Sequence, residues 1–361
     1  MKDVIVVQAV IPDYRVGFFE SLSLKKKIKL VFGDCYFEES VVTSSNAFSF
    51  RNKHISKNRY LCWRKFLLQT WPSIFRDLFS PSVIVVELNP RCITSWLVLI
   101  RSFFLGFGKS VVWGHLLNRK GRLPLLRKIM IFLANGVIFY TNQQSEQFQS
   151  IRLSKHTSHG VAPNAVLNAS NVVHFDSPGK DFIYVGRLTS AKKAQLLARA
   201  FQIALNKLGN DSKLHFVGDG PEVSSLNSWV ESHNLSSRIF IHGHISDYEK
   251  LKQLYATSIA SVSPGYVGLS ITQSLSFGRP MIVADNEPHS PEIEALKPGV
   301  TGEFFCANSE TDLANKLIWF YENRDSWKNK SESISRFCIE NYTYESMVDG
   351  YVKLIEEVAG G

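Results

Sequence analysis

Two cationic side chains follow the apolar run FIYVG at residues 182–186. Arg187 comes directly after this run, and Lys192 lies five residues further on, before the apolar face of a predicted helix begins at Leu196. An arginine can grip a phosphate with two N–H groups and a lysine adds a point charge, so this pair could neutralise a departing phosphate or diphosphate. A lone surface cation more often serves solubility, but placement at a strand end favours a binding role.

A glycine turn in the segment SPGYVGLSITQSLSFGRP could present backbone amides to the same anion. Residues 265–268 form the turn, and residues 269–277 predict a short helix that a glycine ends. An anion at the start of this helix would meet the amides of Gly268, Leu269 and Ser270. Such turns also serve ordinary strand-to-helix connections, so the turn gains weight only together with the two cations.

Several patterns that would indicate other chemistry are absent. The sequence contains no Asp-x-Asp pair, no His-Glu-x-x-His and no Cys and His cluster, so we expect no metal. It contains no matched pair of carboxylates of the kind that a glycosidase needs. The segment after the first predicted strand, residues 11–22, lacks Gly-x-Gly-x-x-Gly, which disfavours a dehydrogenase. We therefore expect no cofactor.

Short β-rich runs alternate with helix-length segments, which predicts an α/β protein with two doubly wound parallel sheets. The runs are DVIVVQA, KLVF, SVIVVEL, KSVVW and GVIFY, and then FIYVG, KLHFVG, RIFIHGHI, SIASV, PMIVA and EFFC. A polar segment at 165–180 separates the two series. We expect one Rossmann-like domain at 1–166, a second at 178–342, and a helix at 343–361 that packs back on the first domain. Ligands would bind at the carboxyl ends of the strands.

The net charge of +9 is distributed unevenly, because residues 1–170 hold 23 Lys and Arg but only 9 Asp and Glu. Basic clusters occur at 25–29, 64–65 and 119–128, and aromatic and leucine residues interleave the last two. This half could therefore dock on an anionic membrane surface, although a merely solvated face explains such runs equally well. No nucleic-acid-binding motif accompanies the clusters, so we expect no nucleic-acid partner.

The remaining sequence features favour a cytoplasmic protein. Its five cysteines are scattered, odd in number and without a Cys-x-x-Cys pair, which argues against a disulfide framework. The N-terminus reads as a buried strand rather than a signal peptide. Arg101 interrupts the most apolar stretch, so we expect no transmembrane helix.

Six segments together resemble a known family, the retaining, family-four glycosyltransferases of the GT-B fold. They are GRLTSAKKAQLL, LHFVGDGPE, RIFIHGHI, VVWGH, VAPNAV and PDYRVGFFESL. The resemblance is strongest from residue 181 to 305. It implies two Rossmann-like domains facing across a cleft, a nucleotide-sugar donor with UDP as its nucleotide, and a lipid-linked saccharide acceptor. It further implies polysaccharide or O-antigen assembly, peripheral on the inner face of the cytoplasmic membrane.

The resemblance also implies which residues act. His115, at the end of VVWGH, would lie beside the donor sugar, while Arg187 and Lys192 would stabilise the leaving diphosphate; a structural histidine is an equally open interpretation of His115. His242 is expected to face away from the base-binding loop, since strand residues alternate faces. The remaining donor-binding candidates are Gly17, Asn164, Gly186, Gly243, His244, Ile245, Gly268, Leu269, Ser270, Gln273 and Glu292.

The sequence departs from the family at three positions. Gly265 and Gln273 stand where the family has two glutamates with seven residues between them, and Lys193 replaces the glycine of its Lys-Gly signature. Gln273 can still accept one hydrogen bond from a ribose through its amide oxygen. Glu292 could supply a carboxylate to the same site, or it could be a solvated glutamate in a first helical turn.

Two other functions remain open on the sequence. A catalytically inactive GT-B scaffold would explain the two missing glutamates. A nucleotide-sugar 2-epimerase shares the architecture, but no acid/base set for it can be placed in this sequence.

Overall fold

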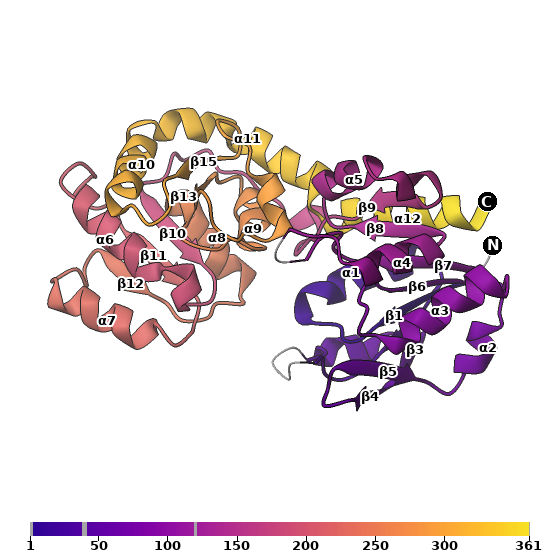
Figure 1. Ribbon diagram of the computed structural model, residues 1–361. Coiled ribbons are helices and arrows are strands. Elements are labelled where there is room, and N and C mark those ends of the chain that lie inside the picture. Colours follow the sequence, from indigo (N-terminus) through magenta and orange to yellow (C-terminus); the bar gives the residue numbers. More distant parts are fainter. Residues whose placement is uncertain (1–2, 38–41, 119–120, 361) are drawn as a thin grey trace. The chain divides into compact units, whose positions relative to one another are not determined.

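The chain divides into two compact units, each built around its own parallel sheet (Figure 1). The structure is a computed structural model that describes residues 3–37, 42–118 and 121–360. Unit 1 comprises residues 1–166 together with 343–361, and unit 2 comprises residues 167–342. Each unit is described by itself.

Unit 1 contains a seven-stranded sheet in the order β3-β2-β1-β6-β7-β8-β9, and all neighbouring strands run parallel. The strand order reverses between β1 and β6. The strands are β1 (Val4–Gln8), β2 (Ile28–Phe32), β3 (Lys53–Ile55), β6 (Val83–Glu87), β7 (Lys109–Trp113), β8 (Gly136–Phe139) and β9 (Ser158–Val161). Their near-continuous Val and Ile runs fit a parallel sheet that is buried on both faces.

Helices cover both faces of this sheet. On one face α1 (Asp13–Lys25) and α12 (Tyr344–Gly360) pack on residues such as Val6 and Trp113. On the other face α3 (Ile93–Phe104) and α4 (Leu125–Leu133) pack on residues such as Val7 and Val112. The remaining helical segments are α2 (Ile74–Leu78), α5 (Asn142–Gln149), η1 (Ser45–Ser49) and η2 (Arg152–Lys155).

A separate antiparallel hairpin, β4 (Lys57–Leu61) and β5 (Phe66–Thr70), projects from unit 1. The Gln69 amide donates to Thr94 Oγ1 (2.8 Å), and the Thr94 hydroxyl donates to the Gln69 carbonyl (2.9 Å), so the start of α3 anchors the hairpin. Trp63 at its tip is 97% exposed. This hairpin was not predicted from the sequence.

Unit 2 contains a six-stranded parallel sheet in the order β12-β11-β10-β13-β14-β15. Its strands are β10 (Asp181–Val185), β11 (Leu214–Val217), β12 (Ile239–Ile241), β13 (Ser258–Ser263), β14 (Met281–Ala284) and β15 (Gly302–Phe305). The order reverses between β10 and β13. In open α/β sheets, ligands bind outside the carboxyl ends of the strands at this kind of reversal.

Helices also cover the second sheet on both faces. They are α6 (Ala194–Ala204), α7 (Val223–Ser232), α8 (Tyr248–Thr257), α9 (Ser270–Ser276), α10 (Glu310–Glu322) and α11 (Arg324–Asn341), with η3 (Ala169–Asn171), η4 (Ser190–Lys192) and η5 (Pro291–Ala295). The helices α6 and α10 share the larger core with Phe182 and Val262, whereas α8 packs on Ile183. In the described part of the chain, none of the helices combines the length and apolarity needed to cross a membrane.

The predicted α/β class and the eleven β-rich runs correspond to strands of the two sheets. The short strands β3 and β9 were not predicted, because they lie at the sheet edges and carry polar or glycine residues. The last helix, α12, packs against β8, β9 and α1 of unit 1.

Candidate functional site

The loops after β10 and β13 lie side by side at the reversal point of the second sheet. Gly186 directly follows β10, and Gly218, which directly follows β11, packs against it: Gly218 has φ +143°, and a Cβ there would lie 1.9 Å from the Gly186 carbonyl oxygen. Glycine is therefore required at position 218 for this approach. The contact fixes the path of the chain just before Arg187.

Arg187 is exposed and forms no ion pair with any described residue. Only its backbone is engaged, since its carbonyl accepts from the Tyr184 hydroxyl (2.8 Å) and the Thr189 amide (3.1 Å). The guanidinium is thus attached to a fixed backbone but keeps its donors for an external anion.

Lys192, at the end of η4, is held by Tyr266 of the glycine turn. Its ammonium donates to the Tyr266 carbonyl (2.5 Å) and lies 4.0 Å from the centre of the Tyr266 ring. It forms no ion pair with a described carboxylate, and burial lowers the pKa of Lys192 to about 8. A partly desolvated cation without a counter-charge is a site where an anion binds favourably.

Lys193 adopts the left-handed conformation, with φ +53°. The position therefore keeps the backbone shape that the family's glycine supplies, although a lysine occupies it. Its ammonium forms an ion pair with Glu287 and donates to Asn308 Oδ1 (2.6 Å). The two neighbouring lysines thus have different surroundings, since one is ion-paired and the other is not.

The turn at residues 265–268 packs tightly against the loop after β10. A Cβ at Gly265 would lie 2.4 Å from the Ala191 carbonyl oxygen, so the fold excludes any side chain there. In this protein a close backbone contact therefore occupies the space where the family's first glutamate would begin its side chain. Gln273, at the second glutamate position, is half-buried on α9. No described residue accepts a hydrogen bond from the amides of Gly268, Leu269 and Ser270.

The segment after β14 braces the same turn. His289 Nδ1 accepts from the Val267 amide (3.1 Å), and Nε2 donates to the Ala284 carbonyl (2.9 Å). Glu292, on η5, is only 7% exposed, so the interpretation of Glu292 as a solvated glutamate is wrong.

The loop after β12 was expected to hold a nucleobase. Gly243 has φ +70°, and its carbonyl accepts from the Gly218 amide (2.8 Å); His244 is exposed and Ile245 packs near Tyr248 and α8. His242 has a partner that the sequence did not indicate: its Nε2 lies 3.0 Å from Nδ1 of His215. His215 Nε2 in turn lies 3.5 Å from buried Asp181.

Three of the predicted site residues lie in unit 1. His115 follows β7, where its ring packs on Tyr140 with the centroids 4.5 Å apart. Burial, and then the charges of Arg127 and Arg15, lower the pKa of His115 to about 4. His115 is therefore neutral near pH 7 and can donate or accept a hydrogen bond but carries no charge.

Arg15 of α1 was not among the site residues predicted from the sequence. It is buried, and its guanidinium lies 4.4 Å from the Trp113 ring and 5.2 Å from the Tyr140 ring. An arginine one turn into the first helix, next to a tyrosine, was the available signal. Its charge is one reason why His115 stays neutral.

The other two predicted residues of unit 1 have different surroundings. Gly17 lies on α1 where a Cβ would be 2.3 Å from the Tyr344 ring, so its small size lets α12 pack against α1. Asn164 is half-buried, three residues after the end of β9. Donor contacts of both residues stay predictions.

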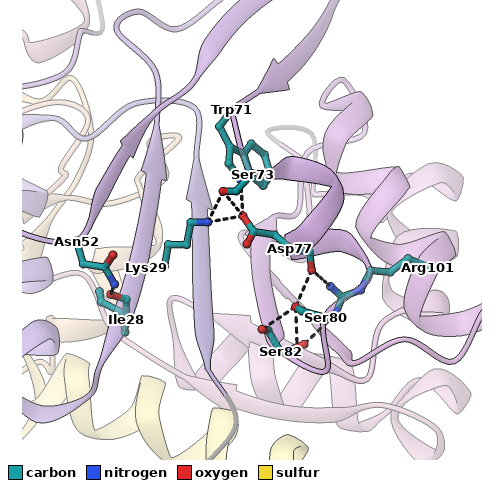
Figure 2. Close-up of polar contacts among 9 residues, drawn as sticks. All are labelled: Ile28, Lys29, Asn52, Trp71, Ser73, Asp77, Ser80, Ser82 and Arg101. Carbon is teal, nitrogen blue, oxygen red and sulfur yellow. Dashed lines mark hydrogen bonds and ion pairs between the residues drawn. The ribbon is translucent and has the colours of Figure 1, made fainter.

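A hollow of about 390 Å³ lies at the opposite, amino-terminal edge of the sheet of unit 1. Asp77 there accepts from Trp71 Nε1 (2.6 Å) and Ser73 Oγ (3.0 Å) and forms an ion pair with Lys29 (Figure 2). The Arg101 guanidinium donates to the Asp77 carbonyl (3.1 Å). These bonds join α2 and α3 to β2, so we assign the group a structural role. No cluster of three metal-ligating side chains occurs in the described ranges.

Comparison with known proteins finds a family match in the second unit. Residues 168–337 match the family Glycosyl transferases group 1. The match lies within unit 2, so this unit is similar to the domain of that family. N-acetyl-alpha-D-glucosaminyl L-malate synthase of Bacillus anthracis is 22% identical over 179 residues, which is 50% of this chain and 46% of that protein. The match thus spans about half the length of this relative.

Solved structures similar to the whole chain establish the fold. Anabaena HepE, in complex with UDP, has a TM-score of 0.70 at 14% identity, covering 99% of this chain and 100% of that one. The lipopolysaccharide outer core galactosyltransferase WaaB, in its apo form, has a TM-score of 0.67 at 16% identity, covering 99% of both. The two Rossmann-like units are therefore those of the GT-B fold, as predicted.

Proposed function

We propose that this protein is a retaining glycosyltransferase that moves a sugar from a nucleotide diphosphate sugar, with UDP as its nucleotide, to a lipid-linked glycan during surface polysaccharide synthesis. The group 1 glycosyltransferase domain supports transfer. UDP bound to Anabaena HepE, and the lipopolysaccharide activity named for WaaB, support the donor and the acceptor. The observation that carries the proposal is Lys192, at the carboxyl edge of the second sheet, whose ammonium pairs with no carboxylate among the described residues.

The chemistry follows from the charges at this edge. Lys192 gains its missing counter-charge from the diphosphate, and the exposed Arg187 can bind a second phosphate oxygen with two N–H groups. Both cations stabilise the negative charge that grows on the leaving diphosphate. In a retaining transfer without a carboxylate base, a leaving diphosphate oxygen accepts the proton of the incoming hydroxyl on the same face of the sugar. Neutral His115 is assigned a hydrogen bond to the donor sugar.

The acceptor proposal is supported by an exposed apolar surface on unit 1. We call it the α2–α4 apolar face; its members are Phe75, Phe79, Leu97, Ile100, Phe103, Phe104, Leu105, Phe107, Leu125, Leu126, Ile129 and Phe132. Phe103 contacts Phe132 (ring centroids 5.5 Å), which joins α3 to α4, and Phe79 contacts Phe107 (5.3 Å), which joins the end of α2 to the loop after α3. A patch of this kind usually marks an interaction site.

Basic residues next to this face favour an anionic lipid surface as the partner. Arg122 and Lys128 are exposed beside the apolar residues of α4; Arg119 and Lys120 lie outside the described residues. The lysine cluster at 25–29 contributes less, because Lys25 and Lys26 form ion pairs with Asp349 and Glu356 of α12. We therefore place peripheral membrane binding, on the inner face of the cytoplasmic membrane, at the α2–α4 apolar face.

A ligand panel tests the donor proposal. The protein is heated with UDP-, GDP- and dTDP-sugars, each with and without EDTA, and unfolding is followed. A donor at 100 times its Kd should add about 2.7 kcal/mol to the free energy of unfolding, and EDTA should not alter the effect, since we propose no metal. Stabilisation by UDP-sugars is the expected result. No stabilisation by any nucleotide sugar would favour the inactive scaffold, and interconversion of a donor without an acceptor would favour a 2-epimerase.

A further inference from the structure

The segment between β14 and η5 holds both loops of the candidate donor site. Its Glu287 forms an ion pair with Lys193 of the loop after β10. Its Ser290 hydrogen-bonds the Tyr266 hydroxyl, and the Ser290 amide donates to the Val267 carbonyl (3.0 Å). One short segment therefore contacts both loops, which also meet directly where the Tyr266 amide donates to the Ala191 carbonyl (3.3 Å).

The partners of His289 determine its protonation state. The Val267 amide can only donate, so the Nδ1 that receives it carries no proton. The Ala284 carbonyl can only accept, so Nε2 carries the proton. The brace therefore requires a neutral imidazole. A second proton would set N–H against N–H and break the bond to Val267.

The charges around His289 oppose one another. Burial is the main cause that lowers the pKa of His289, and the Lys192 ammonium lowers it further. The bond to Ala284 and the Glu287 carboxylate act in the other direction, and Lys193 is already engaged by that carboxylate. The net effect is a lowered pKa of His289. The neutral imidazole therefore persists at neutral pH, and it is lost only at a pH below that at which an ordinary histidine becomes protonated.

The braced turn is the one that holds the candidate phosphate-binding lysine. Tyr266 precedes Val267, and its carbonyl and ring hold the Lys192 ammonium, at 2.5 Å and 4.0 Å. We propose that His289 is a positioning residue: its neutral imidazole fixes the Tyr266–Val267 turn, so that Lys192 and the turn meet the donor diphosphate in one geometry. This role rests on the proposed function. If so, donor binding weakens at low pH because His289 of the protein becomes protonated. We call this loss of affinity the acid limit.

Variants of His289 that keep or remove the hydrogen bond to the Val267 amide can separate a positioning role from a role in folding alone. In His289→Asn the amide oxygen can take the place of Nδ1 and accept from Val267, without titrating. In His289→Leu nothing can accept. His233→Asn is the matched control, because His233 is exposed at the end of α7, outside this site. The Kd of UDP-glucose is measured between pH 7.5 and 5.0; a sugar diphosphate has no phosphate pKa in that range. Hydrogen exchange of the Val267 amide is followed in parallel.

The wild type and His233→Asn should lose about tenfold in UDP-glucose affinity on acidification, as expected for one broken hydrogen bond that positions a charge. His289→Asn should bind almost as tightly as the wild type at pH 7.5 and lack the acid limit. His289→Leu should bind about tenfold more weakly at every pH and lose the protection of Val267. An unchanged acid limit in His289→Asn, or full Val267 protection in His289→Leu, would overturn the role of His289 alone. Failure of the wild type to bind either UDP-glucose or UDP would overturn the proposed UDP-dependent function as well.

Discussion

Arg187 and Lys192 both follow β10, yet the fold prepares them differently. Arg187 is exposed, and only its backbone is fixed, through Tyr184 and Thr189. Lys192 is partly desolvated under the Tyr266 ring, and its pKa falls to about 8. An incoming diphosphate would return Lys192 to the fully charged state. Arg187 can thus bind the ligand from an exposed position with two N–H groups, whereas Lys192 supplies a point charge that Tyr266 holds in place.

At this residue scale, replacing Arg187 tests leaving-group stabilisation. Arg187→Ala should lower turnover by about 10²–10³, because a preorganised donor to the developing charge is lost. The matched control is Arg199→Ala on α6, which removes another exposed arginine, one that pairs with Glu310. Steady-state transfer assays measure the turnover of both variants, and melting curves check that both remain folded. Near-normal turnover of Arg187→Ala would defeat its assignment.

At the scale of elements, helix α12 ties the end of the chain to the first sheet, and its glycines decide how closely it packs. A Cβ at Gly350 would lie 2.0 Å from the Val161 carbonyl oxygen of β9. This neighbour is backbone, so it cannot move aside as a side chain can. Gly17 plays the same role on α1, where the neighbour is the Tyr344 ring.

Gly350→Ala should therefore lower the free energy of unfolding by about 1–3 kcal/mol, despite the better helix propensity of alanine. Gly360→Ala is the internal control, since a Cβ at this position of the same helix meets no atom within 4 Å. Denaturant unfolding of both variants gives the comparison. Equal stability of the two variants would show that α12 can shift away from β9 at no cost.

At the scale of the whole molecule, charge and exposed apolar surface concentrate in unit 1. Phe104 is 68% exposed and Leu125 is 71% exposed, and both belong to the α2–α4 apolar face. Basic residues of α4 and its preceding loop lie beside them. The hairpin with Trp63 at its tip is anchored through Gln69 to Thr94 at the start of α3. The α2–α4 apolar face and the basic residues of α4 are thus both parts of unit 1.

Co-sedimentation with vesicles tests this surface. The protein should bind phosphatidylglycerol vesicles more than phosphatidylcholine vesicles, and binding should weaken as salt shortens the Debye length from about 10 Å at 0.1 M to about 3 Å at 1 M. The double variant Phe104→Ser and Leu125→Ser should lose most of this binding, whereas Ile203→Ser, an exposed apolar residue of unit 2, should not. Equal binding to both lipids, or none at low salt, would refute the proposal.

The sequence by itself determined the two parallel sheets, because continuous Val and Ile runs that alternate with helical periods have few other solutions. It also predicted that Arg187, Lys192 and the glycine turn follow strands of the second sheet, at the edge where ligands are expected to bind. These inferences depend on residue type and local spacing, which a sequence displays directly.

Only the tertiary structure decided how those residues are held. That Gly265 has no room for a side chain, that Lys193 pairs with Glu287, and that His289 braces Val267 all depend on loops brought together from distant parts of the chain. The burial that lowers the pKa of Lys192 and His115 is likewise a sum over many neighbours. Charge state and fit are set by such long-range packing, which no local pattern encodes.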